Sequence, residues 1–152
     1  LRPQSWSSAF TCWGLDNREA AVRVVSTLRG REMPSTNLEL KPSDNTCNPY
    51  LALGGLIVAG LDGLRRELEL DDALRADVDP ATIPEVEREA RGIRRLPDTL
   101  DAALDALERD AVLMDALGDL LARSYLAVRR SEWRAFSTAD AAFEQRHHFF
   151  KY

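Results

Sequence analysis

The sequence feature that most constrains the fold is a helix start at Asn48-Pro49, followed by regularly spaced apolar residues. Asparagine is a favoured N-cap because its side chain accepts hydrogen bonds from the first backbone N–H groups, and proline suits the first helical position. Apolar residues then recur at the spacing of one helix face. They are Leu53, Leu56, Ile57, Leu61, Leu64 and Leu68. We therefore expect a long helix from about residue 48 with this apolar side.

The same helix contains glycines at positions 54, 55, 60 and 63. Each glycine costs about 1 kcal/mol relative to alanine inside a helix. We expect close packing of the helix against another backbone to offset this cost.

Residues 9 to 41 favour strands separated by polar or glycine-containing breaks. The expected strands run from Phe10 to Gly14, from Ala21 to Val25 and from Asn37 to Lys41. The second is apolar apart from Arg23. Side chains in a strand alternate between its two faces. Asn37, Glu39 and Lys41 are therefore expected on one polar face, and Leu38 and Leu40 on the other. This polar face is a candidate lining for a cleft.

The segment from Asp71 to Arg95 is charged and contains two prolines, so it favours an exposed, partly mobile excursion over a second core layer. Helices are expected after it. Asp98 is the expected cap of a helix with inward-facing Leu100, Ala103, Leu104 and Leu107. The next helix is expected to use Leu117, Leu120, Leu121, Tyr125 and Val128. Ser137 and Asp140 form a weak capping box before a final helix.

Composition narrows the class of protein. At 152 residues and 45% hydrophobic content, the chain is long enough for one core-forming domain. Its net charge of −5 argues against a nucleic-acid partner. The longest apolar run, Tyr50 to Leu61, is too short to span a membrane. Cys12 and Cys47 lack metal-ligand spacing, which favours a reduced intracellular compartment and leaves a disulfide between them as an alternative.

Three segments, Asn17 to Val24, Asn37 to Lys41 and Asn48 to Leu53, resemble in this order the C-terminal part of the glutamine synthetase catalytic domain. Weaker similarity covers Leu96 to Leu100, Tyr125 to Ala127 and Glu132-Trp133. The resemblance implies an α+β fold, with a few antiparallel strands over about 9–41 and several helices over about 48–152. Members of this family are much longer, and this chain starts at Leu1. The resemblance therefore implies that residues 1–152 are a C-terminal fragment of such a domain.

The resemblance also implies a function. Family members are ATP-dependent carbon–nitrogen ligases of glutamine biosynthesis and nitrogen metabolism. They activate the side-chain carboxylate of glutamate as γ-glutamyl phosphate and pass it to ammonia or another amine, with Mg²⁺ or Mn²⁺. A cytoplasmic, ring-shaped homo-oligomer is expected for the full-length protein, and inactivity is expected for the fragment alone, since most metal ligands are missing.

Site residues follow from the matched motifs. Arg18 and Arg23 fall on paired arginines that contact the nucleotide phosphates and the phosphoryl group in transfer, and Arg18 is the catalytic candidate. Glu39 falls on a carboxylate ligand of the catalytic metal ion. Conventional members flank this glutamate with arginines, whereas this chain has Asn37 and Lys41. Lysine keeps the charge but lacks the planar fork of arginine, so Lys41 is an altered substrate contact.

The opening segment from Leu1 to Trp6 resembles the family's flap, where ammonia-using members carry a glutamate that closes the site. Trp6 offers an apolar face and one N–H donor in its place. This difference makes Trp6 a candidate substrate-binding residue for an amine other than ammonia. The pattern resembles most the branch that contains nodulin-type plant proteins and bacterial γ-glutamyl-amine ligases.

Other readings stay open. From the residues alone, Glu39 and Lys41 could form a solvated ion pair on a strand whose neighbour carries Arg23 at the sheet edge. A catalytically silent relative acting as an interaction or regulatory protein is the alternative function, motivated by Asn37, Lys41 and Trp6. A helical partner-binding domain is a third hypothesis.

Overall fold

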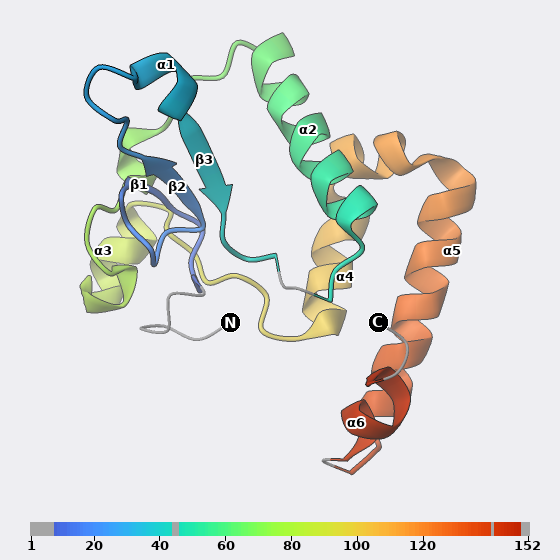
Figure 1. Cartoon of the computed structure of the whole chain (residues 1–152). Helices are drawn as coiled ribbons and strands as arrows, with labels where there is room; N and C mark the ends of the chain where they lie inside the picture. Colours follow the sequence, from blue (N-terminus) through green and yellow to red (C-terminus); the bar gives the residue numbers. More distant parts are fainter. Residues whose placement is uncertain (1–7, 44–45, 141, 150–152) are drawn as a thin grey trace. The chain divides into compact units, whose positions relative to one another are not determined.

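The computed structural model describes residues 8–43, 46–140 and 142–149 (Figure 1). The chain divides into two compact units. The first comprises Leu1–Asn45 and Glu69–Leu96, and the second comprises Thr46–Leu68 and Pro97–Tyr152. The expected strands and the expected long helix therefore belong to different units.

A three-stranded sheet in the order β1-β2-β3 forms the first unit's framework. Its strands are β1 (Trp13–Leu15), β2 (Val22–Val25) and β3 (Asn37–Leu40), and the short helix α1 (Glu32–Ser35) lies between β2 and β3 in sequence. β2 and β3 are antiparallel, whereas β1 and β2 are parallel, so the sheet is mixed rather than antiparallel throughout. A parallel neighbour must start at the same end of the sheet as β1, so the connection has to run back along the length of β1. Because β1 has only 3 residues, the short connection 16–21 can span that length.

The segment between residues 71 and 95 contributes to the core of the first unit, which differs from the expected exposed excursion, although most of its residues are exposed. It contains two short 3₁₀ helices, η1 (Asp72–Leu74) and η2 (Pro80–Thr82), and the helix α3 (Glu85–Ala90). Charged residues and prolines separate most of its apolar residues, and composition alone does not show which of them are buried. The core combines residues from both parts of the unit: Ala9, Phe10, Cys12, Ala20, Ala76, Ile83 and Ile93.

The second unit is helical. It contains α2 (Pro49–Arg65), α4 (Leu100–Arg109), α5 (Ala111–Ser137) and α6 (Phe143–His148), and both α2 and α4 pack against α5. The predicted start of α2 is confirmed. The Asn48 side chain accepts hydrogen bonds from the backbone N–H groups of Tyr50 at 3.0 Å and Leu51 at 3.3 Å.

Two predicted caps differ in the structure. The N-cap of α4 is Thr99 rather than Asp98, because Thr99 has an extended backbone and its hydroxyl accepts the amide of Ala102 at 3.2 Å. Ser137 is the last residue of α5 and donates to the carbonyl of Arg134, so it forms no capping box with Asp140. Asp140 instead accepts a hydrogen bond from the amide two residues on, just before α6.

The buried face of α5 also differs from the prediction. Ala122 and Leu126 are buried, whereas the predicted Leu120 and Val128 are exposed. Gly118 has a non-helical backbone, with φ of 69° and ψ of 159°. Because Leu120 and Val128 both follow this break, their exposure depends on which side of the helix packs against its neighbours.

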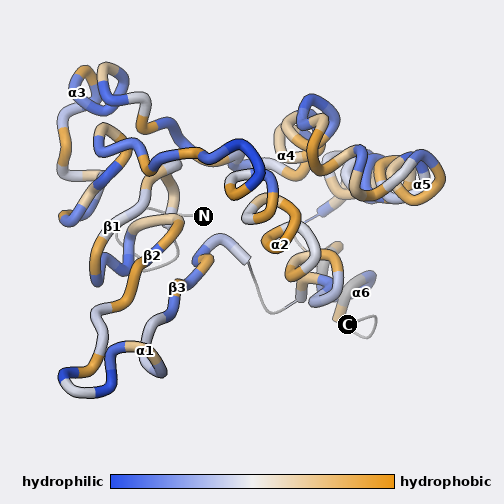
Figure 2. The backbone as a smooth tube through the Cα atoms, turned by 90° about the horizontal axis from the view of Figure 1, so that it is seen from above, coloured by the Kyte–Doolittle hydropathy of each residue, from blue (hydrophilic) through white to orange (hydrophobic). Residues whose placement is uncertain are grey.

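Helix α2 forms as predicted, but it does not pack as predicted, because its apolar side is not buried. None of its residues is buried, and the predicted apolar side is largely exposed at Leu53, Ile57, Leu61 and Leu64. Apolar residues run along the whole helix (Figure 2). At Gly54, Gly60 and Gly63 an added Cβ would meet no described atom within 4 Å. The predicted close backbone contact is therefore absent from the described residues. None of the helices in the described ranges is both long enough and apolar enough to cross a membrane.

Candidate functional site

The candidate site lies on the polar face of β2 and β3. Arg23 and Glu39 are direct partners across these antiparallel strands, and an Arg23 Nη donates to Glu39 Oε2 at 3.1 Å. The Lys41 ammonium lies 3.9 Å from the same oxygen. The shared face of Glu39 and Lys41 is as the alternation predicts, and the simple ion pair between them also exists.

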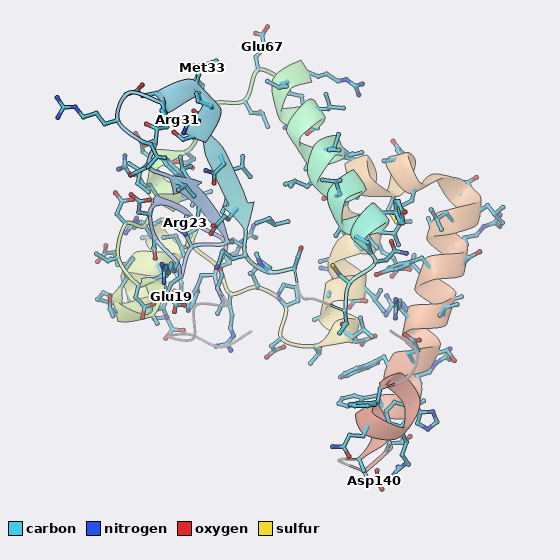
Figure 3. The ribbon with its side chains drawn as sticks, in the orientation of Figure 1. Glu19, Arg23, Arg31, Met33, Glu67 and Asp140 are labelled. Atoms are coloured by element: carbon cyan, nitrogen blue, oxygen red, sulfur yellow. The ribbon has the colours of Figure 1, made fainter. Side chains whose placement is uncertain are left out.

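Arg23 is not an arginine of the sheet edge. It lies on β2, the central strand of the first unit's sheet (Figure 3). Its side chain is 17% exposed, compared with 42% for Glu39. The guanidinium is therefore the best-shielded charge of this cluster. Its Nε has no hydrogen-bond partner among the described residues.

A second carboxylate, which the sequence did not single out, approaches Arg23 from the connection after β1. Asp16 Oδ1 lies 3.7 Å from an Arg23 Nη. The same oxygen accepts the backbone N–H of Ser26 at 2.9 Å, and the Ser26 hydroxyl bonds the other carboxylate oxygen. These hydrogen bonds from Ser26, with a smaller contribution from Arg23, hold the pKa of Asp16 below its usual range. Asp16 therefore stays ionised at neutral pH.

The backbone of Asp16 has a positive φ of 50°, a conformation that aspartate and asparagine tolerate better than most residues. Its amide donates to the carbonyl of Val24 at 2.9 Å. An aspartate directly after a strand and before an asparagine is a turn signal, and this signal could have drawn attention to the position.

Asn17 fixes this connection to the core of the first unit. Its buried side-chain amide donates to the carbonyls of Ala76 at 2.6 Å and Val78 at 2.9 Å, and its oxygen accepts the amide of Glu19 at 2.9 Å. A Cβ at Gly14 would lie 2.2 Å from the Ala76 carbonyl oxygen, so only glycine fits this close approach. Gly14 and Asn17 thus fix the backbone just before Arg18.

The other two predicted site residues stand differently. Arg18 is exposed in the connection between β1 and β2, directly after buried Asn17. Trp6 lies outside the described residues. The structure therefore brings together Arg23, Glu39 and Lys41.

The cluster contains two cations, Arg23 and Lys41, and two carboxylates, Asp16 and Glu39. An incoming anion would compete with Glu39 for the cations, and an incoming metal ion would compete with the cations for Glu39. Within the described ranges, no group of three or more His, Cys, Asp or Glu residues is placed to hold a metal ion. Glu39, which is paired with two cations, therefore does not form a complete metal centre within the described residues.

Comparison with known proteins decides the family. The family described as "Glutamine synthetase, catalytic domain" matches residues 1–148. The chain belongs to the glutamine synthetase family. It is 46% identical over 132 residues to a gamma-glutamylpolyamine synthetase of Streptomyces coelicolor, which covers 87% of this chain. It is 37% identical, with the same coverage, to a glutamine synthetase of Methanococcus maripaludis.

Solved structures of glutamine synthetase relatives share the fold. A crystal structure of a novel glutamine synthase homolog superposes with a TM-score of 0.68 at 36% identity, over 90% of this chain and 28% of that one. A ligand-free GmaS structure has a TM-score of 0.66 at 29% identity, over 97% of this chain and 31% of the other. The chain also spans 28% of the length of each of the two sequence relatives named above.

Proposed function

We propose that this chain is the C-terminal part of an ATP-dependent γ-glutamyl-amine ligase. In the proposed reaction, the γ-carboxylate of glutamate attacks the terminal phosphate of ATP, giving γ-glutamyl phosphate and ADP. The amine then attacks the acyl carbon, a carbon–nitrogen bond forms, and inorganic phosphate leaves. Membership of the glutamine synthetase family supports the reaction class.

The observation that carries the proposal is the cross-strand cluster of Arg23, Glu39 and Lys41. Phosphoryl transfer to a carboxylate gathers negative charge, so catalysis depends on cations aimed at the transferring oxygens. Arg23 is held on the central strand and offers a planar fork suited to phosphate. Arg18 is proposed as the catalytic arginine that joins it at the nucleotide phosphates.

Glu39 is proposed as one ligand of an Mg²⁺ or Mn²⁺ ion whose remaining ligands lie outside this chain. Its carboxylate is turned toward two cations, Arg23 and Lys41, which would have to release it for a metal ion. The metal would neutralise the charge of the transferred phosphoryl group. Lys41 is proposed to contact the glutamate substrate as a point charge.

An amine larger than ammonia is the proposed acceptor. Identity is 46% to the gamma-glutamylpolyamine synthetase and 37% to the archaeal glutamine synthetase over the same length of alignment. Trp6 replaces the glutamate that the resemblance places in ammonia-using members. An indole supplies an apolar wall for the methylene groups of a longer amine and a cation–π surface for its ammonium.

Several properties of the intact ligase are also proposals. It is expected to be a cytoplasmic homo-oligomeric ring, and the 152-residue chain alone is expected to be inactive. Glu39 is the single proposed metal ligand here, which supports the expectation of inactivity.

The test is a product assay on the longer protein that contains this chain, with glutamate, ATP and Mg²⁺ or Mn²⁺. Ammonia, ethanolamine, a polyamine and an aromatic amine are supplied separately, and products are identified by mass. We expect the γ-glutamyl amide of the polyamine, with Glu39→Gln reducing the rate at least a hundredfold and Asn37→Ala serving as a control on the same strand. Glutamine as the dominant product would refute the larger acceptor.

No amide with any amine, together with no release of ADP, would refute the ligase proposal. That outcome would favour the silent interaction or regulatory relative. The specific observations in favour of this second function are Asn37 and Lys41, which stand where the resemblance places arginines.

A further inference from the structure

The two carboxylates beside Arg23 differ in how firmly they are held. Asp16 is fixed by the backbone N–H and the hydroxyl of Ser26, and its own amide is bonded to Val24. Glu39 has its hydrogen bond from Arg23 and the approach of Lys41, and its side chain projects from a strand at the sheet edge. The Asp16 carboxylate is therefore part of the framework, and the Glu39 carboxylate is the more easily exchanged partner.

The guanidinium spans these two groups with different nitrogens. One Nη lies 3.1 Å from Glu39 Oε2, and the other lies 3.7 Å from Asp16 Oδ1. Because the Arg23 side chain is only 17% exposed, water has limited access to replace a lost partner. A guanidinium that lost Glu39 to a competing cation would keep a counter-ion at Asp16.

We propose that Asp16 is a positioning residue that holds the Arg23 guanidinium on the polar face of the sheet independently of Glu39. When the Glu39 carboxylate turns to another cation, the Asp16 carboxylate keeps the Arg23 guanidinium in its orientation. A phosphate group that binds there then meets an arginine that is already positioned. This inference rests on the proposed function for its purpose, but the ion-pair geometry behind it does not.

The test measures rotation of the Arg23 guanidinium about its Cζ–Nε bond by NMR, on the 152-residue chain without nucleotide or amine. Restricted rotation gives separate signals for the two Nη groups. The variants are Asp16→Asn, Glu39→Gln and their combination. Asparagine suits the positive φ at position 16 and can still accept the Ser26 amide, so Asp16→Asn removes charge with little change in backbone.

We expect Asp16→Asn to speed the rotation about two- to fivefold, the effect of losing a partly exposed ion pair. Glu39→Gln alone should leave the Nη signals separate, and the double variant should merge them. Asp77→Asn is the matched control, because Asp77 likewise accepts a backbone amide, that of Leu15, and pairs with a different arginine, Arg75. The Arg23 rotation rate in this variant should stay within a factor of 1.5 of the starting protein, on the order of error for such a small change.

Unchanged rotation in Asp16→Asn, or merged signals in Glu39→Gln alone, would overturn the proposal. If Asp16→Asn is less stable, its unfolding midpoint and the backbone amide signal of Ser26 separate a general loosening from a local release of Arg23. A shift of both together with faster rotation would also count against a positioning role. A failed amine assay on the longer ligase would leave this measurement intact, so the two proposals fail separately.

Discussion

Asn17→Ala should strongly destabilise the first unit. The side chain makes three hydrogen bonds, and those with the Ala76 carbonyl and the Glu19 amide are buried. The third, to Val78, is partly buried, so water can partly replace it. Leaving a buried donor or acceptor without a partner costs about 1–3 kcal/mol, so the two buried bonds together predict a loss of about 2–6 kcal/mol.

The assay uses the Cys12 thiol, which is 5% exposed in the core of the first unit. Exposed Cys47 is first replaced by serine so that Cys12 reports alone. The rate of Cys12 labelling then follows opening of the first unit when closing is faster than labelling. A loss of 2 kcal/mol should speed labelling about thirtyfold, since 1.4 kcal/mol corresponds to a factor of ten.

The matched control is Asn37→Ala, which removes the same amide from an exposed position with one bond to the Ser35 carbonyl, at 2.9 Å. It should change stability by no more than about 0.5 kcal/mol. Asn17→Asp should be at least as damaging as Asn17→Ala, because a carboxylate oxygen would face two carbonyl oxygens. If the rate of Cys12 labelling in Asn17→Ala is no more than threefold faster than in the Asn37→Ala control, the anchoring role of Asn17 is refuted.

Three further outcomes follow from the structure. Leu104→Ala should cost about 2–5 kcal/mol in a urea melt of the helices followed by circular dichroism, because Leu104 is 2% exposed and its loss leaves a cavity. Cys47 should react with a thiol reagent at neutral pH while Cys12 does not, because burial shields the Cys12 thiol and raises its pKa. The free energy of unfolding should fall less steeply with acid in Asp16→Asn than in the starting protein. The folded state lowers the pKa of Asp16 from 3.8, so the ionised Asp16 stabilises the fold, and this stabilisation is lost as pH falls through the lowered pKa.

Each of these outcomes has a control. Leu120→Ala removes an equal side chain from a site that is 76% exposed on α5, and a loss equal to that of Leu104→Ala would contradict the cavity argument. Denaturant should release the second thiol, and two thiols reacting without it would contradict burial of Cys12. For the acid melt, equal slopes between pH 5 and 2 in both proteins would contradict the lowered pKa of Asp16, since that window brackets ordinary carboxyl titration.

Local sequence signals placed several elements correctly. Asn48 and Pro49 set the start of α2, because a cap and a proline act on their own backbone neighbours. Alternation along β3 put Glu39 and Lys41 on one face for the same local reason. The parallel pairing of β1 with β2 had no such signal, because strand direction depends on how the connection folds over the core.

The sequence did not predict which residues of segment 71–95 and of α5 are buried. The segment 71–95 was expected to be exposed, yet Ala76, Ile83 and Ile93 complete the first core. In α5 the buried residues are Ala122 and Leu126 rather than the predicted Leu120 and Val128. Both differences arise because burial depends on what packs opposite a residue, and composition in one segment does not contain that information.

The candidate site shows the same division. The motif residues by themselves determined the family, the reaction class expected of it and the candidates Arg18, Arg23 and Glu39. Tertiary structure alone decided that Arg23 lies on a central strand between Glu39 and Asp16. A side chain's charge and hydrogen-bonding capacity are fixed by its type, but which opposite charge it meets depends on strand register and on a turn held by Asn17.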